Sequence, residues 1–213
     1  MTLRRDQVAR FITLEGGEAV GKSTQAARLA QALHERGIET VVTREPGGTP
    51  GAEAIRALLM TGDEDRWSAR AESLLFAAAR ADHVEKVICP ALARGVWVVC
   101  DRFIDSTRAY QGGAGGIPDR DILALHALSC DGLMPDRTLV MHLAADEAGQ
   151  RADIRDAGQV DRFGARDGEY HRKLSETFLT LARAEPARFR LIDAAGAIDD
   201  VTSRMLVAIE DLF

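Results

Sequence analysis

Gly16-Gly17-Glu18-Ala19-Val20-Gly21-Lys22-Ser23 is the stretch that decides the fold of this chain. It satisfies the pattern G-x-x-x-x-G-K-[ST], whose glycines let the backbone curl so that several N–H groups point at one phosphate. The apolar residues 11–15 before it predict a strand. Residues 22–36 after it predict a helix, whose positive dipole end faces the same phosphate. This context favours a nucleotide-binding loop over a chance Gly-rich turn.

Two further groups complete the donor site that this loop predicts. Lys22 supplies a mobile positive charge for the β- and γ-phosphates of ATP, and the Ser23 hydroxyl is a ligand for Mg²⁺. Asp101 follows the apolar run 96–100, and a carboxylate at such a strand end can orient Mg²⁺ or its water shell. A lone Asp after a strand is more often a cap or turn residue, but the presence of the phosphate loop favours the Mg²⁺ role for Asp101. The predicted ATP contacts are Gly16, Gly17, Glu18, Ala19, Val20, Gly21, Lys22, Ser23 and Thr24.

Short apolar runs alternate with longer helical stretches along the rest of the chain, which predicts an α/β fold with helices covering a parallel sheet. We expect a three-layer P-loop NTPase fold with five strands, in one domain spanning residues 1–213. Residues 150–168 are polar, rich in Arg, Asp and Gly, and without an apolar period, so they predict a mobile lid rather than core. The strands are expected at residues 11–15, 39–43, 96–100, 137–143 and 189–192, and the helices at residues 22–36, 52–60, 69–94, 119–130, 167–184 and 198–211.

Composition limits the function classes. The 213 residues are 46% hydrophobic and 28% charged, and the net charge of -6 gives no broad basic surface for nucleic acid. Cys89, Cys100 and Cys130 are far apart, which argues against a disulfide framework or a zinc site. Cys100 ends an apolar run and Cys89 lies in a helical pattern, so we interpret these two as packed thiols. We expect no signal peptide and no membrane span, and therefore a cytoplasmic location.

P-loops serve switches, motors and kinases, so the fold alone does not give the function. The sequence contains no asparagine. The usual guanine-reading motif Asn-Lys-x-Asp is therefore absent, and guanine switch domains are disfavoured.

Five segments together resemble bacterial thymidylate kinases. Their order and spacing match that family over nearly the whole chain, from residue 11 to the C-terminal helix. Each segment alone is a weak signal, whereas five in order are highly specific. The segments are Glu18 within the phosphate loop, Thr43-Arg44-Glu45-Pro46-Gly47-Gly48, Leu75-Phe76-Ala77-Ala78-Ala79-Arg80, Asp101-Arg102-Phe103 and Ser106-Thr107-Arg108-Ala109-Tyr110-Gln111-Gly112.

The resemblance implies that the acceptor is dTMP. Arg44 and Arg102 would hold its phosphate, because the planar guanidinium fork suits phosphate oxygens. Phe76 would stack on the thymine ring. Arg80 is four residues further along the same helix face and would reach a carbonyl oxygen of the base. A surface arginine and a core phenylalanine are the plain alternatives for such residues.

The resemblance also implies contacts to the sugar and the pyrimidine edge. Thr107 and Gln111 would hydrogen-bond the base, and Tyr110 would pack against the sugar, leaving little room for a 2′-hydroxyl. Glu18 would accept from the 3′-hydroxyl or help to organise the Mg²⁺ shell. Helix capping and surface polarity explain these four residues equally well at the level of sequence.

The predicted chemistry requires no general base, because the acceptor phosphate is largely dianionic at neutral pH. The phosphate loop carries no basic residue before Lys22, so the resemblance implies the form of the family that places a catalytic arginine in the lid. Arg151 and Arg155 are four residues apart and are the candidates, whereas Arg162 is less well placed by spacing. Asp161-Arg162-Phe163-Gly164 lacks the glutamate expected after the apolar residue.

The sequence and the resemblance together predict a P-loop kinase that carries out ATP:dTMP phosphotransfer, with Lys22, Arg102, Arg151 and Arg155 as catalytic residues. The resemblance further implies a homodimer packed through long helices such as 69–94. Two alternatives stay open. The first is a P-loop kinase for another nucleoside monophosphate, against which Phe76, Arg80 and Gln111 argue. The second is a nucleotide-binding regulatory module without turnover, which the intact loop disfavours.

Overall fold

Five parallel strands form one sheet in the order β2-β3-β1-β4-β5, so the strand that leads into the phosphate loop is central. The computed structural model describes residues 8–63, 65–143, 162–164 and 166–213. The α/β class and the five-stranded parallel sheet are both confirmed. The strands are β1 (Phe11–Gly16), β2 (Thr40–Arg44), β3 (Trp97–Asp101), β4 (Arg137–His142) and β5 (Phe189–Asp193).

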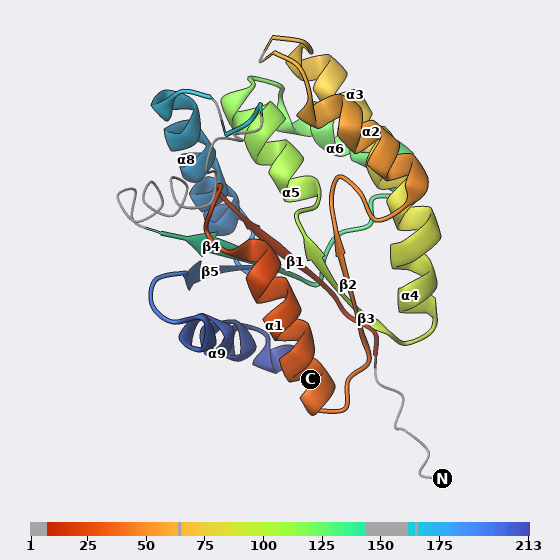
Figure 1. The fold of residues 1–213 in the computed structure, drawn as a ribbon, viewed down its shortest axis with the longest axis vertical. Coiled ribbons are helices and arrows are strands. Elements are labelled where there is room, and N and C mark those ends of the chain that lie inside the picture. The colour runs from red at the N-terminus through yellow and green to blue at the C-terminus, as the bar shows by residue number, and fades with distance from the viewer. Residues whose placement is uncertain (1–7, 64, 144–161, 165) are drawn as a thin grey trace.

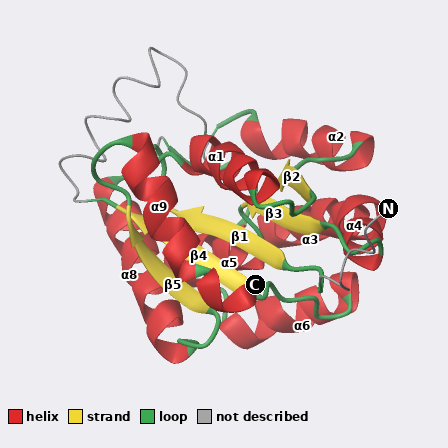
Figure 2. Ribbon diagram, turned by 90° about the horizontal axis from the view of Figure 1, so that it is seen from below, coloured by secondary structure: helices red, strands yellow, loops and turns green. Residues whose placement is uncertain are grey.

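Helices cover both faces of the sheet and make three layers (Figures 1 and 2). On one face α1 packs beside α9, and on the other α5 contacts β1 while α8 contacts β5. α3 packs against both α2 and α6. The helices are α1 (Lys22–Glu35), α2 (Pro50–Met60), α3 (Ala69–His83), α4 (Cys89–Ala93), α5 (Ile104–Thr107), α6 (Asp119–Cys130), α8 (Gly168–Ala184) and α9 (Ile198–Ala208).

The core is divided by the sheet because side chains alternate along each strand. Ile12 and Leu14 of β1 belong to the cluster under α1 and α9, whereas Phe11 packs on the opposite face. The face opposite α1 also contains polar groups: Thr13 and Thr138 are buried, and their hydroxyls lie 3.0 Å apart. The sheet therefore carries an apolar layer on one side and a partly polar layer on the other.

Some helix boundaries differ from the prediction. The helix expected over 69–94 is continuous in direction but passes through a π-helical segment, Val84–Ile88, between α3 and α4. The helix expected over 198–211 ends at Ala208, and a 3-10 turn, Glu210–Leu212, follows. A 3.6-residue apolar period does not reveal such local changes of winding, because the same face stays buried on average.

Two sequence expectations need correction. Cys89 is exposed and is not the packed thiol that was expected, whereas Cys100 is buried as expected; Cys130 is buried as well. Most of the predicted lid lies outside the described residues, but Arg162 and Phe163 are described and both are buried, so this end of the segment belongs to the core. The prediction rests on the polar composition of residues 150–168, and a single Phe163 in that segment gives no apolar period that would indicate a buried ring.

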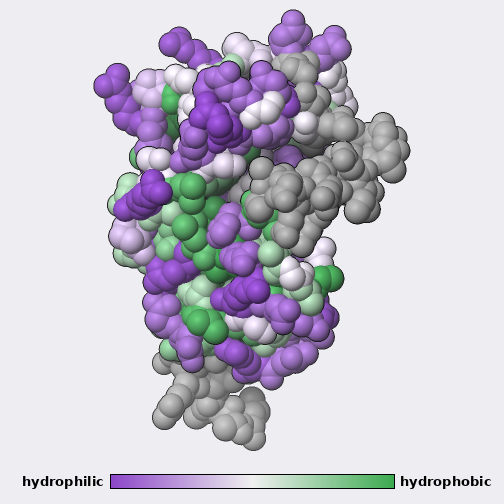
Figure 3. Space-filling view, turned by 90° about the vertical axis from the view of Figure 1, so that its left-hand side faces the viewer, coloured by the Kyte–Doolittle hydropathy of each residue, from purple (hydrophilic) through white to green (hydrophobic). Residues whose placement is uncertain are grey.

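The surface is mixed in character. On the face at the left of Figure 1, apolar side chains show between polar ones (Figure 3). β5 forms an edge of the sheet, and its Leu191 is exposed. Among the described helices, none combines the length and the apolar character needed to cross a bilayer.

Candidate active site

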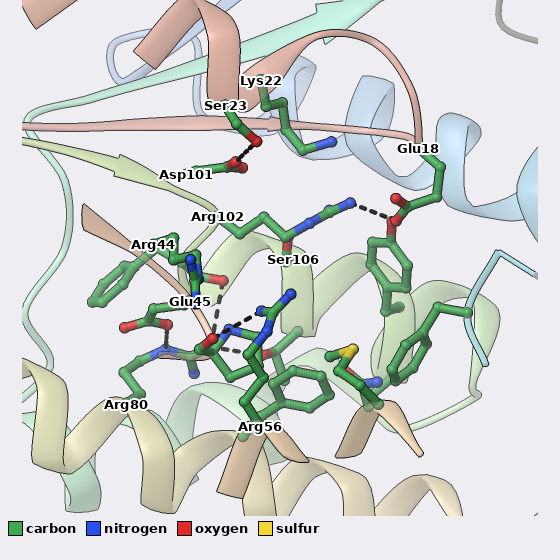
Figure 4. A pocket seen from close by; sticks show the side chains of 18 of the residues that line it. Glu18, Lys22, Ser23, Arg44, Glu45, Arg56, Arg80, Asp101, Arg102 and Ser106 are labelled. Atoms are coloured by element: carbon green, nitrogen blue, oxygen red, sulfur yellow. Dashed lines mark hydrogen bonds and ion pairs between the residues drawn. The ribbon is translucent and has the colours of Figure 1, made fainter. Parts of the chain in front are cut away.

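A cavity of about 570 Å³ opens at the carboxyl ends of β1, β2 and β3. Its volume lies within the range of small-molecule sites, and the carboxyl edge of a parallel sheet is where such sites form. Figure 4 shows that side chains from the phosphate loop, from the ends of β2 and β3, and from α2 and α3 project into one space. The cavity thus unites segments far apart in the sequence.

The phosphate loop turns from β1 into α1 as the sequence predicts. Gly16 has φ 129°, and a Cβ there would lie 2.2 Å from the carbonyl oxygen of Met141 on β4. Gly21 has φ 92° and is the N-cap of α1. Both positions therefore require glycine, one for close approach and the other for a left-handed turn.

Lys22 is the first residue of α1, and its ammonium folds back over the loop. Its Nζ donates to the carbonyl oxygen of Gly17 at 2.5 Å and to that of Gly16 at 3.4 Å. Burial, and secondarily the Arg102 guanidinium, lowers the pKa of the ammonium from 10.5 to about 8. An incoming polyphosphate would raise this pKa again, because an opposite charge nearby favours the charged form.

Ser23 and Asp101 meet beside the loop. The Ser23 hydroxyl donates to Asp101 Oδ2 at 2.7 Å, which Figure 4 shows as a dashed line. Asp101 Oδ1 is buried, and among the described residues no hydrogen-bond partner reaches it. A buried carboxylate oxygen without a donor fits a cation or its water shell. A hydroxyl and a carboxylate are oxygen ligands of the kind Mg²⁺ prefers, so these residues fit the expected metal.

Arg102 lies at the centre of the cavity, directly after β3. Its Nη1 donates to the Gly16 carbonyl oxygen at 3.1 Å, and its Nη2 donates to Glu18 Oε1 at 2.6 Å. The Tyr110 hydroxyl donates to the same Glu18 oxygen at 2.8 Å, and burial raises the pKa of that hydroxyl well above its usual value. The three predicted residues Glu18, Arg102 and Tyr110 therefore form one cluster against the phosphate loop.

Arg44 approaches from the end of β2. Its side chain is half exposed and its Nη2 pairs with both carboxylate oxygens of Glu53 on α2, at 2.9 and 3.1 Å. Arg56 of α2 also lines the cavity, and its Nη1 donates to the Pro46 carbonyl oxygen at 2.9 Å. The sequence analysis missed Arg56, which carries a second positive charge close to that of Arg44 (Figure 4).

The opposite end of the cavity holds the residues predicted to contact the base. Phe76, Arg80, Thr107 and Gln111 all line it. Arg80 is 2% exposed, and its Nη2 donates to Thr107 Oγ1 at 2.8 Å. Its Nε donates at 2.7 Å to Glu45, a buried carboxylate to which the sequence analysis gave no role. Arg80 is therefore held from two sides.

Two residues missed by sequence reasoning complete this end. The Phe163 ring lies 5.9 Å from both the Phe76 ring and the Tyr110 ring, centroid to centroid. Glu72 of α3 is buried and accepts a hydrogen bond from Gln111 Nε2 at 3.1 Å. The available signal was spacing, because Glu72 precedes Phe76 by one helical turn on the same face.

Glu15, at the end of β1, is a further buried carboxylate that sequence reasoning missed. It accepts from the backbone N–H of Phe103 at 2.8 Å and from the Ser106 hydroxyl at 2.6 Å. Burial, and then the nearby Asp105 carboxylate, raises the pKa of Glu15 from 4.5 to about 8. These bonds fix the turn that carries Arg102 relative to the strand that carries the phosphate loop.

The predicted lid arginines are only partly placed. Arg151 and Arg155 lie outside the described residues. Arg162 is described, and its guanidinium donates to Glu72 Oε1 at 3.0 Å and to the Leu59 carbonyl oxygen at 2.9 Å. The Arg162 side chain is thus an anchor against α2 and α3.

A P-loop at the topological switch point, a hydroxyl and carboxylate pair beside it, and arginines facing it across a nucleotide-sized cavity define a P-loop kinase of small phosphorylated acceptors. The family model for thymidylate kinase matches residues 14–205. The chain belongs to the thymidylate kinase family.

Individual relatives agree with the family match. The thymidylate kinase of Rhizorhabdus wittichii is 55% identical over 203 residues, which cover 95% of this chain and 98% of the relative. That of Caulobacter vibrioides is 51% identical, covering 91% of this chain and 92% of the relative. The crystal structure of thymidylate kinase from Ehrlichia chaffeensis has a TM-score of 0.76 and 32% identity, and the match covers 94% of this chain and 98% of that one.

Proposed function

We infer that this chain is a dTMP kinase, which transfers the γ-phosphoryl group of ATP to the 5′-phosphate of dTMP and so produces dTDP for DNA precursor synthesis. Its membership of the thymidylate kinase family supports this activity. The observation that carries the inference is one cavity lined on the donor side by Lys22 and Asp101 and on the acceptor side by Arg44, Arg102 and Arg80.

The transfer needs positioning and charge neutralisation more than covalent chemistry. The acceptor phosphate oxygen is itself the nucleophile, so no residue has to remove a proton from it. Lys22 and the loop N–H groups would bind the β- and γ-phosphates of ATP. Arg102 and Arg44 would hold the acceptor phosphate in line, with Arg56 close enough to share that charge. Arg44 would exchange its pairing with Glu53 for the phosphate, since both offer oxygens to the same fork.

Mg²⁺ is the cofactor that the donor side fits, with Ser23 Oγ and Asp101 as the residues that would hold it or its water. When bound, the ion neutralises charge on the β- and γ-phosphates. The buried oxygen Asp101 Oδ1 supports this role. The Ser23–Asp101 hydrogen bond keeps both oxygens at the mouth of the loop.

The acceptor end suits thymine. Phe76 would stack on the base, and Arg80 would donate to the C4 carbonyl oxygen. Gln111 and Thr107 would complete the pyrimidine edge. Tyr110, hydrogen-bonded to Glu18, would pack against the sugar and leave little room for a 2′-hydroxyl. Arg151 and Arg155 remain the proposed lid arginines.

A homodimer is also proposed. Leu74 of α3 is 60% exposed and Leu128 of α6 is 84% exposed, and α3 and α6 pack on each other. Exposed apolar side chains on neighbouring helices favour a protein partner. Sedimentation analysis of the wild type and of Leu128→Glu would test this: a monomeric wild type would contradict it. A cytoplasmic location and the absence of a nucleic-acid partner remain predictions.

The activity is tested by a coupled assay with ATP, Mg²⁺ and a panel of dTMP, dUMP, dCMP, dGMP and AMP. The highest kcat/KM is expected with dTMP, and Lys22→Met serves as the control for contaminating kinases. A preference for dCMP or AMP would reject the thymidylate assignment and keep the kinase class. Nucleotide binding with no transfer to any acceptor would instead favour a non-catalytic module.

A further inference from the structure

Glu72 is a buried carboxylate whose two oxygens bind different parts of the molecule. Its side chain is 4% exposed and lies on α3, one turn before Phe76. Oε1 accepts from Arg162 Nη2 at 3.0 Å, and Oε2 accepts from Gln111 Nε2 at 3.1 Å. One carboxylate therefore joins the anchor at residue 162 to a glutamine that lines the acceptor cavity.

The carboxylate dictates how the glutamine amide is turned. An amide has one accepting end and one donating end, whereas an ionised carboxylate can only accept. Gln111 must therefore direct Nε2 toward Glu72. Because Gln111 lines the cavity and one N–H of Nε2 is bound to Glu72, Oε1 is the accepting atom that the amide can offer to a ligand.

The neighbouring arginine presents the opposite polarity. Arg80 is purely a donor and is fixed by Glu45 Oε2 at 2.7 Å and Thr107 Oγ1 at 2.8 Å. Arg80 donates to Thr107, which precedes Gln111 by one helical turn, so the cavity lining supplies this donor near an acceptor. Thymine and uracil carry an accepting C4 carbonyl beside a donating N3–H, which complements this order. Cytosine carries a donating amino group beside an accepting N3, which opposes it at both positions.

We propose that Glu72 is a positioning residue for base selection: it fixes the Gln111 amide with Oε1 toward the base and so makes the site select N3–H pyrimidines over cytosine. This inference rests on the proposed function, since it assigns the base end of the same cavity. Glu72 does not touch the substrate and acts through Gln111. The other carboxylate oxygen of Glu72, Oε1, accepts from Arg162 and lies 3.7 Å from Arg166 Nη2, so the carboxylate faces donors on that side as well.

The plain alternative is that Glu72 only anchors Arg162. The two roles predict different kinetics, because an anchor affects stability and overall rate, whereas an orienting residue affects the preference between bases. Glu72→Gln keeps the size of the side chain but can donate as well as accept, so the Gln111 amide is free to turn. Arg162→Gln is the matched control, since it removes the anchor while leaving the acceptor-only group facing Gln111.

The experiment measures kcat/KM for dTMP and dCMP in the wild type, Glu72→Gln and Arg162→Gln, with thermal unfolding for each. Glu72→Gln is expected to lower the dTMP:dCMP ratio by about tenfold or more, mainly through a higher KM for dTMP and a better kcat/KM for dCMP. Arg162→Gln is expected to keep the ratio within about twofold even where it lowers stability. Adding Gln111→Glu to Glu72→Gln should recover the preference in part, because a carboxylate at 111 accepts in either orientation.

Two outcomes would overturn the proposal: an unchanged ratio in Glu72→Gln, or an equal fall in Arg162→Gln. If Glu72→Gln does not fold because the buried Arg162 has lost the Glu72 carboxylate, the double variant Glu72→Gln/Arg162→Gln is compared with Arg162→Gln. This comparison measures the same change at residue 72, and the double variant carries no charge at either position. A wild type that does not prefer dTMP over dCMP would instead refute the thymine assignment itself. The two failures are therefore distinguishable.

Discussion

Replacing Lys22 with methionine is expected to stabilise the nucleotide-free protein while abolishing transfer. The lysine side chain is 7% exposed, and its pKa is lowered from 10.5 to about 8, chiefly by burial. At about 1.36 kcal/mol for each pKa unit, holding this ammonium charged near neutral pH costs the folded state about 3 kcal/mol. Methionine has a similar length and no charge. It loses the hydrogen bonds to Gly16 and Gly17, which offsets about 1–2 kcal/mol.

Lys22→Met is therefore expected to have a free energy of unfolding about 1–2 kcal/mol higher than that of the wild type at about pH 7. How this difference changes with pH tests whether the buried ammonium is its cause. The pKa of Lys22 is lower in the folded state than in the unfolded state. Between about pH 8 and pH 10.5 the unfolded wild type therefore binds more protons, and the wild type becomes more stable as pH rises. The difference in free energy of unfolding between Lys22→Met and the wild type should be largest below about pH 8. It should be smaller by about 2 kcal/mol at about pH 9.5.

Urea unfolding of the wild type, Lys22→Met and Lys173→Met at both pH values provides the measurement. Lys173 is an exposed lysine paired with Glu169, so its replacement should change stability little at either pH. A Lys22→Met protein less stable than the wild type at neutral pH would refute the reasoning. So would an advantage of the same size at both pH values.

Three further predictions follow from other contacts. Asp105→Asn should lower the free energy of unfolding by about 3 kcal/mol or more, because the buried carboxylate pairs with Arg188 at 2.5 Å; a loss below about 1 kcal/mol in urea unfolding would contradict this. Asp101→Asn should raise the Mg²⁺ concentration for half-maximal activity by about tenfold with a smaller effect on KM for dTMP; an unchanged Mg²⁺ titration would remove this residue from the metal site. Arg151→Ala or Arg155→Ala should lower kcat by on the order of 10³ with a smaller change in dTMP affinity; losses under about threefold in both would leave the lid-arginine mechanism without support.

Local chemistry explains why the donor site could be predicted from the sequence. The phosphate loop is a contiguous stretch whose glycines, lysine and serine act within one turn, and the structure forms it as expected. Asp101 is adjacent in space through the pairing of β1 with β3, which the alternation of strands and helices already implied. Phe76 and Arg80 shared a visible helix face.

The carboxylates that orient these groups could not be predicted in the same way. Glu45 binds Arg80 across 35 positions, and Glu72 binds Gln111 across 39. In the sequence, Glu15 is simply the polar residue at the end of an apolar strand. The residues that donate to its carboxylate, Phe103 and Ser106, lie 88 and 91 positions away. Such pairs depend on tertiary packing, and a single sequence carries no local period for them. The buried ring of Phe163 was hidden for the same reason.

The central position of β1 has a consequence for how the chain acquires its site. β1 pairs with β3 from Val98 onward and with β4 from Arg137 onward, so both of its neighbours lie far downstream in the sequence. Closing such long loops is entropically costly and slows folding. During synthesis β1 leaves the ribosome before both of its neighbours, so it can be paired on both edges only after residues 137–142 have followed. The phosphate loop is thus synthesised well before β4 and is fixed in its binding shape only once β4 has been added to the sheet.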